Sequence, residues 1–237
     1  MAAPSVFEKK HIDPSRMGKI ESLLVHFNLP APVLEGYRAH RGLIHAIFIG
    51  LIILVVALSL YSSWHSQRIE KSATALATAL AQEKSALGDH LARLMNTYPR
   101  TNAALWAEIE LAHLKMEQKD YAGAVGAYTV LLGKVSDGNP LQPPLLYALA
   151  QAQEAAGKYD ETIATYEKLQ KHQTYQFMAT IGLGGQYEAK KDWVKAIAVY
   201  EGYKARMQGQ AVQAGDAVTN EAIAMLDEKI ALLRARQ

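Results

Sequence analysis

Two hydrophobic patterns divide the chain into a short first part and a longer second part. Residues 43–61 (LIHAIFIGLIILVVALSLY) are mostly apolar and carry no acidic or basic side chain except His45, whereas later apolar residues recur with the period of an amphipathic helix. A helix of 19 residues is about 28 Å long, close to the thickness of a bilayer's hydrocarbon core. Tyr61 and Trp64 follow where the headgroup layer is expected. The pattern predicts a transmembrane anchor over residues 42–64.

Basic residues near the anchor predict its orientation. Arg38 and Arg41 stand directly before it, and Arg68 and Lys71 follow it. The preceding tail holds six basic and four acidic residues, so the positive-inside rule places the N-terminus in the cytoplasm. Ala57-Leu58-Ser59 resembles a signal-peptide cleavage site, but a signal peptide has a short basic leader and this tail is long and partly acidic. We therefore expect a retained, single-pass anchor.

The cytoplasmic tail, residues 1–41, contains one predicted amphipathic helix at about residues 14–27. Its apolar stripe consists of Ile20, Leu23, Leu24 and Phe27. Such a helix rests on the membrane surface or docks against a cytoplasmic partner, and a disordered tail is the third interpretation.

Small residues recur along one side of the anchor. They are Gly42, Ala46, Gly50 and Ala57. Small side chains let a second membrane helix approach closely, so this side is a candidate transmembrane packing face. A solitary anchor is the alternative, because glycine and alanine are common in membrane helices.

Three later segments share one pattern, at intervals of 38 and 34 residues. Each has a small residue in a first helix and another in a second helix, an aromatic residue at the turn, and a tyrosine further along. The small pairs are Ala112 with Ala124, Ala150 with Thr162 and Gly184 with Ala196; the turn aromatics are Tyr121, Tyr159 and Trp193; the tyrosines are Tyr128, Tyr166 and Tyr200. No single hairpin of this kind buries its own apolar face. The pattern predicts stacked helical hairpins over residues 100–207.

The segment before these hairpins, residues 65–99, has two interpretations. A seven-residue recurrence favours a stalk helix or coiled-coil seam, through Ala73, Leu80, Leu87 and Leu94. The frame of the repeat, projected backwards, predicts instead a degenerate first hairpin that breaks at or just before Gly88. We favour the hairpin.

The end of the chain, residues 208–237, is predicted to close the stack. Gln208–Asp216 is polar and contains glycine, which indicates a linker. An amphipathic helix over Ala217–Arg234 follows, with an apolar stripe that a solenoid needs to cover its last hairpin. That stripe is Ile223, Leu226, Ile230 and Leu233.

The sequence contains no spacing typical of a catalytic or cofactor site. Cysteine is absent, and the eight histidines lack the i, i+4 spacing of a zinc motif. Gly182, Gly184 and Gly185 lack the spacing and the preceding strand of a phosphate-binding loop. The net charge of +2 arises in the tail, so the remainder has no basic field for nucleic acid. We predict no enzyme activity, metal, cofactor, small-molecule substrate or nucleic-acid partner.

Residues 105–207 resemble the tetratricopeptide repeat (TPR) family. The small pairs and the aromatic residues carry the resemblance, although the first-helix tryptophan of the family is replaced at Glu108, Leu146 and Thr180. Together with the predicted anchor, the resemblance implies an all-α fold: one N-terminal transmembrane helix, then a TPR-like α-solenoid of about three to four hairpins with a C-terminal capping helix.

The same resemblance implies that a concave face, lined by the first helices, binds polypeptide segments of other proteins. The candidate partner-binding residues are Trp106, His113, Met116, Tyr147, Gln151, Glu154, Met178 and Glu188. Packing of Trp106 against Tyr98-Pro99 is the alternative for that residue.

The anchor and the stretch TYPRTNAALWAEIELAHLKMEQKDYAGAVGAY together resemble the ancillary TPR subunits of the bacterial Sec translocon. This resemblance implies an inner-membrane protein with a periplasmic repeat domain that acts as a chaperone for exported chains or links the translocon to other chaperones. A second hypothesis is an accessory, assembly or structural subunit of a membrane complex, docked through Gly42, Ala46 and Gly50.

Overall fold

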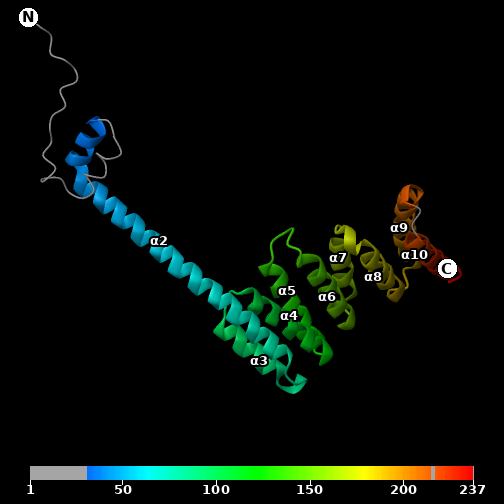
Figure 1. Cartoon of the computed structure of the whole chain (residues 1–237). Coiled ribbons are helices and arrows are strands. Elements are labelled where there is room, and N and C mark those ends of the chain that lie inside the picture. The colour runs from blue at the N-terminus through cyan, green and yellow to red at the C-terminus, as the bar shows by residue number, and fades with distance from the viewer. Residues whose placement is uncertain (1–30, 215–216, 237) are drawn as a thin grey trace, which may run out of the picture. The chain divides into compact units, whose positions relative to one another are not determined.

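The computed structural model describes residues 31–214 and 217–236, and all regular structure in that part of the chain is helical (Figure 1). The chain divides into two compact units, one ending at Gln67 and the other beginning at Arg68. The all-α fold predicted from the sequence is confirmed. The predicted tail helix at 14–27 lies outside the described residues.

The first unit is dominated by α2 (Ala31–Leu80), a helix that continues into the second unit. Residues 39–80 include a window with a mean hydropathy of 2.9, long and apolar enough to cross a membrane, and none of that window is buried. α2 begins well before the predicted anchor, and the backbone leaves helical geometry at His40 (φ −120°, ψ 18°). The sequence therefore located the apolar segment but not the helix around it.

The last part of α2, from Arg68, packs against α3 (Lys84–Thr97) in the second unit. After the half-buried Arg68, its buried or half-buried side chains are Ser72, Ala75, Leu76 and Ala79, which follow the i, i+3, i+4, i+7 spacing of one helix face. The seven-residue register fails here, because Ala73 and Leu80 are exposed. The two helices are separated at residues 81–83, and Gly88 lies inside α3.

Seven further helices follow α3, each packed against the next along the described chain (Figure 1). They are α4 (Asn102–Glu117), α5 (Tyr121–Lys134), α6 (Gln142–Ala155), α7 (Tyr159–Leu169), α8 (Gln176–Ala189), α9 (Trp193–Ala214) and α10 (Ala217–Arg234), with a 3₁₀ turn at Gln173–Tyr175 before α8. Pro143 falls in the first turn of α6, where proline is well tolerated.

The turn inside each repeated hairpin has the same backbone conformation. Its central residue is left-handed, with φ of 62° at Lys119, 71° at Gly157 and 59° at Lys191. The next residue donates its N–H to a carbonyl five positions back: Asp120 to Lys115, Lys158 to Gln153 and Asp192 to Tyr187, each at 2.9 Å. This is a Schellman motif, which ends one helix and directs the chain into the next.

The repeated small residues lie where two helices meet. The pairs Ala112 with Ala124, Ala150 with Thr162 and Gly184 with Ala196 are all buried. A Cβ atom on Gly184 would lie 2.2 Å from the Tyr200 ring, and one on Gly182 would lie 2.2 Å from the Tyr166 ring. α8 therefore carries one glycine for the tyrosine of α9 and another for the tyrosine of the preceding helix, α7.

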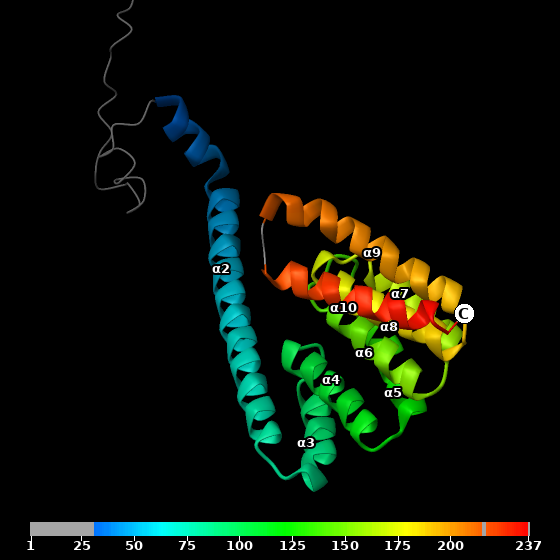
Figure 2. The same ribbon diagram turned by 90° about the vertical axis from the view of Figure 1, so that its right-hand side faces the viewer.

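The solenoid ends in α9 and α10, which lie side by side (Figure 2). Leu226, Ile230 and Leu233 of α10 are buried against Tyr200 and Tyr203 of α9. α9 extends to Ala214, so residues 208–214 are helical and the predicted linker at Gln208–Asp216 is wrong over that range. Alanine and glutamine favour helix there, and a single glycine costs only about 1 kcal/mol.

Candidate protein-binding surfaces

The eight residues predicted to line a concave face differ in exposure. Trp106 (44 % exposed), His113, Gln151, Glu154 and Met178 (49 % exposed) lie open to solvent. Met116, Tyr147 and Glu188 are half-buried. The repeat intervals place Trp106 and Met178 at one repeat position, and Met116, Glu154 and Glu188 at another.

Both glutamates among these eight residues already accept hydrogen bonds from tyrosines within the fold. The Tyr166 hydroxyl donates to Glu154 Oε2 at 3.4 Å, and the Tyr200 hydroxyl donates to Glu188 Oε1 at 2.6 Å. Lys229 Nζ of α10 donates to the same Glu188 oxygen at 3.2 Å. Glu188 thus joins three helices, α8, α9 and α10, and is a poor candidate for holding a partner.

Burial controls the ionisation of the repeated tyrosines. It raises the pKa of Tyr128 to about 12, with a smaller effect from the Glu110 carboxylate. Burial, together with the neighbouring Glu154, also raises the pKa of Tyr166. The pKa of Tyr200 is raised by burial and by its hydrogen bond to Glu188. These hydroxyls remain neutral near pH 7 and serve packing rather than acid–base chemistry.

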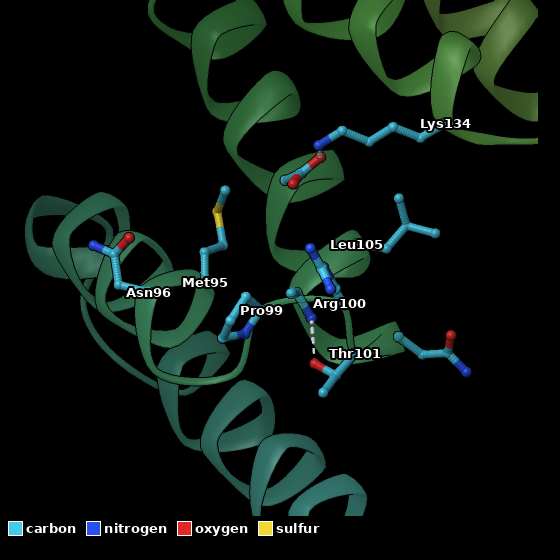
Figure 3. Close-up of a pocket in the computed structure, with 10 residues that line it drawn as sticks. Met95, Asn96, Pro99, Arg100, Thr101, Leu105 and Lys134 are labelled. Atoms are coloured by element: carbon cyan, nitrogen blue, oxygen red, sulfur yellow. Dashed lines mark hydrogen bonds and ion pairs between the residues drawn. The ribbon is translucent and has the colours of Figure 1, made fainter.

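A separate surface lies on the other side of α4, where two adjacent hollows separate α3 from α5. The first, of about 600 Å³, extends from Pro99 and Arg100 to Lys134 (Figure 3). The second, of about 540 Å³, extends from Glu108 to Lys115 along α4 and is walled by α5. They share Met95, Glu108 and Lys134 as lining residues. We refer to the two hollows together as the α4 furrow.

The floor of the α4 furrow is one face of α4. Ala104, Glu108, Leu111 and Lys115 follow each other at i, i+4, i+7 and i+11. Trp106 and His113 lie about 140–160° around the helix from Glu108. None of the eight residues predicted from the sequence lines either hollow.

The α5 wall of the furrow is apolar and small. It consists of Gly123, Gly126, Ala127, Val130 and Leu131, with Val130 58 % exposed. Lys134 at the end of this wall pairs with Glu108 at 2.5 Å, across the junction of the two hollows. The second hollow is therefore apolar between the Glu108–Lys134 pair at one end and Lys115 at the other.

The sequence contained a signal for this surface that the repeat pattern concealed. α5 carries no charged residue from Tyr121 to Gly133, whereas α7 and α9 carry charges at equivalent positions. Aligning the repeats by their small and aromatic residues shows only the features that the hairpins share. The absence of charge in α5 is confined to one hairpin, so that alignment does not show it.

The described residues contain no cluster of three or more histidine, aspartate or glutamate side chains able to hold a metal ion. What they offer is exposed apolar side chains on α4 and α8, and one furrow with cationic ends. Such surfaces suit contact with another polypeptide.

Stacked helical hairpins with shared small and aromatic positions define an α-solenoid of the kind that typically serves as a non-enzymatic scaffold for protein binding. The chain belongs to the tetratricopeptide repeat-like domain family, whose sequence model matches residues 37–227.

Several solved structures resemble the chain. One is a candidate kinesin light chain of Podosopora anserina with nearly identical TPR-like repeats, at 14 % identity and a TM-score of 0.49, covering 72 % of this chain and 95 % of that one. A candidate protein-binding protein of Bacteroides ovatus has 15 % identity and a TM-score of 0.40, covering 72 % of this chain and 98 % of that one. Identities this low say nothing about shared partners. No curated protein matches the chain.

Proposed function

We propose that this protein is a membrane-anchored module that binds other polypeptides through its helical repeats. The observation that carries the proposal is the combination of a fully exposed apolar helix segment with a solenoid of the TPR-like family. Exposed apolar surface of this extent on α2 requires a lipid or protein environment. We propose an anchor at residues 42–64, a degenerate first hairpin at 65–99, the repeats at 100–207 and a closing segment at 208–237.

The proposed location is the bacterial inner membrane, with the N-terminus in the cytoplasm and the repeats in the periplasm. Arg38 and Arg41 before the apolar segment support this orientation. In this location the repeats bind exported polypeptide segments as a chaperone or beside the Sec translocon. The sequence resemblance to ancillary TPR subunits of that translocon supports this role.

The second candidate function is that of a fixed subunit or assembly factor of an inner-membrane complex. Gly42, Ala46 and Gly50 favour it, because small residues at four-residue spacing form one side of the apolar helix. A neighbouring helix has room to approach α2 along this side.

Photocrosslinking in cells tests both candidates. A photoreactive side chain is introduced singly at Trp106, Gln151, Met178 and Val130, with Glu167 on α7 as a control. Client binding predicts many transient products from the first four positions and few from Glu167. A fixed subunit predicts one dominant product that co-purifies in mild detergent. Absence of protein products at all five positions contradicts polypeptide binding.

The proposed orientation has its own test, since the chain contains no native cysteine. A cysteine introduced at Gln151 is expected to react with a membrane-impermeant maleimide added from the periplasmic side. Reaction only after the inner membrane is broken would contradict a periplasmic repeat domain.

A further inference from the structure

The outward face of α5 differs from those of the other second helices. Its exposed residues include Ala122, Gly126, Thr129 and Gly133. The equivalent exposed residues are Asp160, Ala164, Glu167 and Lys171 in and after α7, and Val194, Ala198, Glu201 and Ala205 in α9. α7 thus has three charges on this face and α9 has one, while α5 has none. Each hairpin has a second helix, and α5 is the one whose surface another molecule is best suited to cover. Its exposed face is uncharged and lies beside an apolar hollow.

Gly126 is not required by the packing within the protein. A Cβ atom on Gly123 would lie 2.0 Å from the Asp120 carboxylate, which caps α5 by accepting from Gly123 N–H at 3.0 Å. A Cβ atom on Gly126 would meet nothing within 4 Å. Glycine inside a helix costs about 0.5–1 kcal/mol relative to alanine, yet it lets another backbone approach closely. Gly126 therefore fits a wall against which a partner helix rests.

The charges around the α4 furrow favour an anionic partner. Its lining includes Arg100, Lys115 and Lys134, and Glu108 is the one carboxylate among them. Glu108 is neutralised by Lys134, and Lys115 Nζ lies 3.9 Å from the Asp120 carboxylate. Arg100, held at the α3–α4 turn with φ 63°, has no ion-pair partner among the described residues. Cations thus stand at both ends of an apolar centre.

We propose that the α4 furrow binds an amphipathic helix of a partner protein, with an apolar face against Leu111, Ala127 and Val130 and acidic residues toward Arg100 and Lys115. This inference rests on the proposed polypeptide-binding function and specifies its partner. The floor from Ala104 to Lys115 spans about 16 Å, or three helical turns, at 1.5 Å per residue. Two copies of this chain joined through the furrow would bring like cations together without a free carboxylate, which disfavours self-association.

Two labelled helical peptides of about 16 residues, or about 24 Å, serve as probes. Both carry leucine on one face, and one carries glutamate and the other lysine on the flanks. Binding to the full-length protein in neutral lipid nanodiscs is measured by fluorescence anisotropy. We expect the glutamate peptide to bind at least about tenfold more tightly than the lysine peptide.

Substitutions locate the binding surface. Gly126→Leu fills the furrow wall and is expected to weaken the glutamate peptide about tenfold, whereas Gly202→Leu, at an equally open glycine of α9, leaves it unchanged. Leucine is the better helix former, so both variants keep their helices. Arg100→Asn removes a charge at a left-handed position that asparagine tolerates, and is expected to reduce the preference between the two peptides several-fold.

Equal affinity for the two peptides, or an unchanged affinity in Gly126→Leu, would overturn the inference. A dimer seen by sedimentation and lost in Gly126→Leu would assign the furrow to a second copy and overturn it as well. If the peptide-binding experiment fails while crosslinks at Trp106, Gln151 or Met178 persist, the proposed polypeptide-binding function still stands. Failure of the furrow proposal and failure of the proposed function are therefore distinguishable.

Discussion

Glycine positions in α8 show how a single hydrogen atom in place of a methyl group sets the spacing of helices. The rings of Tyr166 and Tyr200 occupy the space that side chains at Gly182 and Gly184 would need. Gly185, the next residue, has nothing within 4 Å of a Cβ position. Adjacent glycines in one helix therefore have opposite roles.

Alanine substitution separates these roles. Gly184→Ala is expected to lower the free energy of unfolding by about 1–3 kcal/mol, because the methyl group overlaps the Tyr200 ring. Gly185→Ala is expected to raise it by up to about 1 kcal/mol through helix propensity. Urea unfolding of the full-length protein in detergent micelles, followed by circular dichroism, measures both. Equal effects of the two substitutions would contradict the packing described.

The buried tyrosines predict sensitivity to alkali. An unfolded tyrosine ionises near pH 10, while burial raises the pKa of Tyr128 to about 12 and also raises those of Tyr166 and Tyr200. Stability from these hydroxyls is complete below pH 10 and falls as the pH rises through about 12, because the unfolded chain loses protons first. Each tyrosine contributes a slope of about 1.4 kcal/mol per pH unit in that window.

Urea unfolding at intervals between pH 9 and pH 12 checks this slope. Tyr128→Phe removes one titrating group and is expected to flatten the fall between pH 10 and 12. A pH profile identical to that of the unsubstituted protein would show that Tyr128 does not contribute.

At the scale of elements, the Schellman turns connect one helix of each hairpin to the other. All three place a residue in left-handed geometry, but only the second uses glycine, at Gly157. Lys119 and Lys191 adopt the same conformation with a side chain that disfavours it.

Removing a glycine from one of these turns and introducing a glycine into another are expected to change the free energy of unfolding in opposite directions. Gly157→Ala should lower the free energy of unfolding by about 1 kcal/mol, since alanine is strained at φ 71°. Lys119→Gly should raise it by up to about 1 kcal/mol. Thermal unfolding of both variants gives the comparison, and a stabilising Gly157→Ala would contradict the left-handed turn.

The closing helix, α10, is the element that makes the last hairpin stable. Leu226 is fully buried and packs in a cluster with Ile197, Tyr200 and Tyr203 of α9. Leu226→Ala is expected to cost about 2–5 kcal/mol from the lost burial and the cavity left behind.

Hydrogen exchange locates the damage of Leu226→Ala. Amides of α9 and α10 are expected to lose protection, while those of α4 and α5 keep theirs, because a solenoid transmits stability between neighbours. Met225→Ala, at an exposed neighbouring residue, is the control. Uniform loss of protection through α4–α10 would contradict local coupling.

At the scale of the whole molecule, the repeat predicted most of the fold because its cause is local packing. Ala112, Ala150 and Gly184 are small in the sequence for the same reason that they are buried in the structure. Register and boundaries were harder to predict. The predicted heptad ran through Ala73 and Leu80, whereas the buried face of the helix contains Ser72 and Ala79, one residue earlier in each case. Helix α9 continued through Gly209, where the composition indicated a linker.

The α4 furrow was beyond prediction for a different reason. It is formed by α3, α4 and α5 together, and its lining lies on the side of α4 away from Trp106 and His113, which the repeat pattern emphasised. Glu188 shows the converse case, since a carboxylate predicted to face a partner also accepts hydrogen bonds from Tyr200 and Lys229 inside the fold. A single sequence predicts which side of a helix a residue lies on, but it does not predict which residues of other helices contact that side.

The serial packing of the helices has a consequence for evolution. Because the principal contacts of each helix in the second unit are with its predecessor and successor, α5 is free to diverge without disturbing the packing of α9 on α10. A new recognition surface can therefore arise on one hairpin at little cost to the others. Distant hairpins can acquire different partners while the spacing of their backbones stays the same.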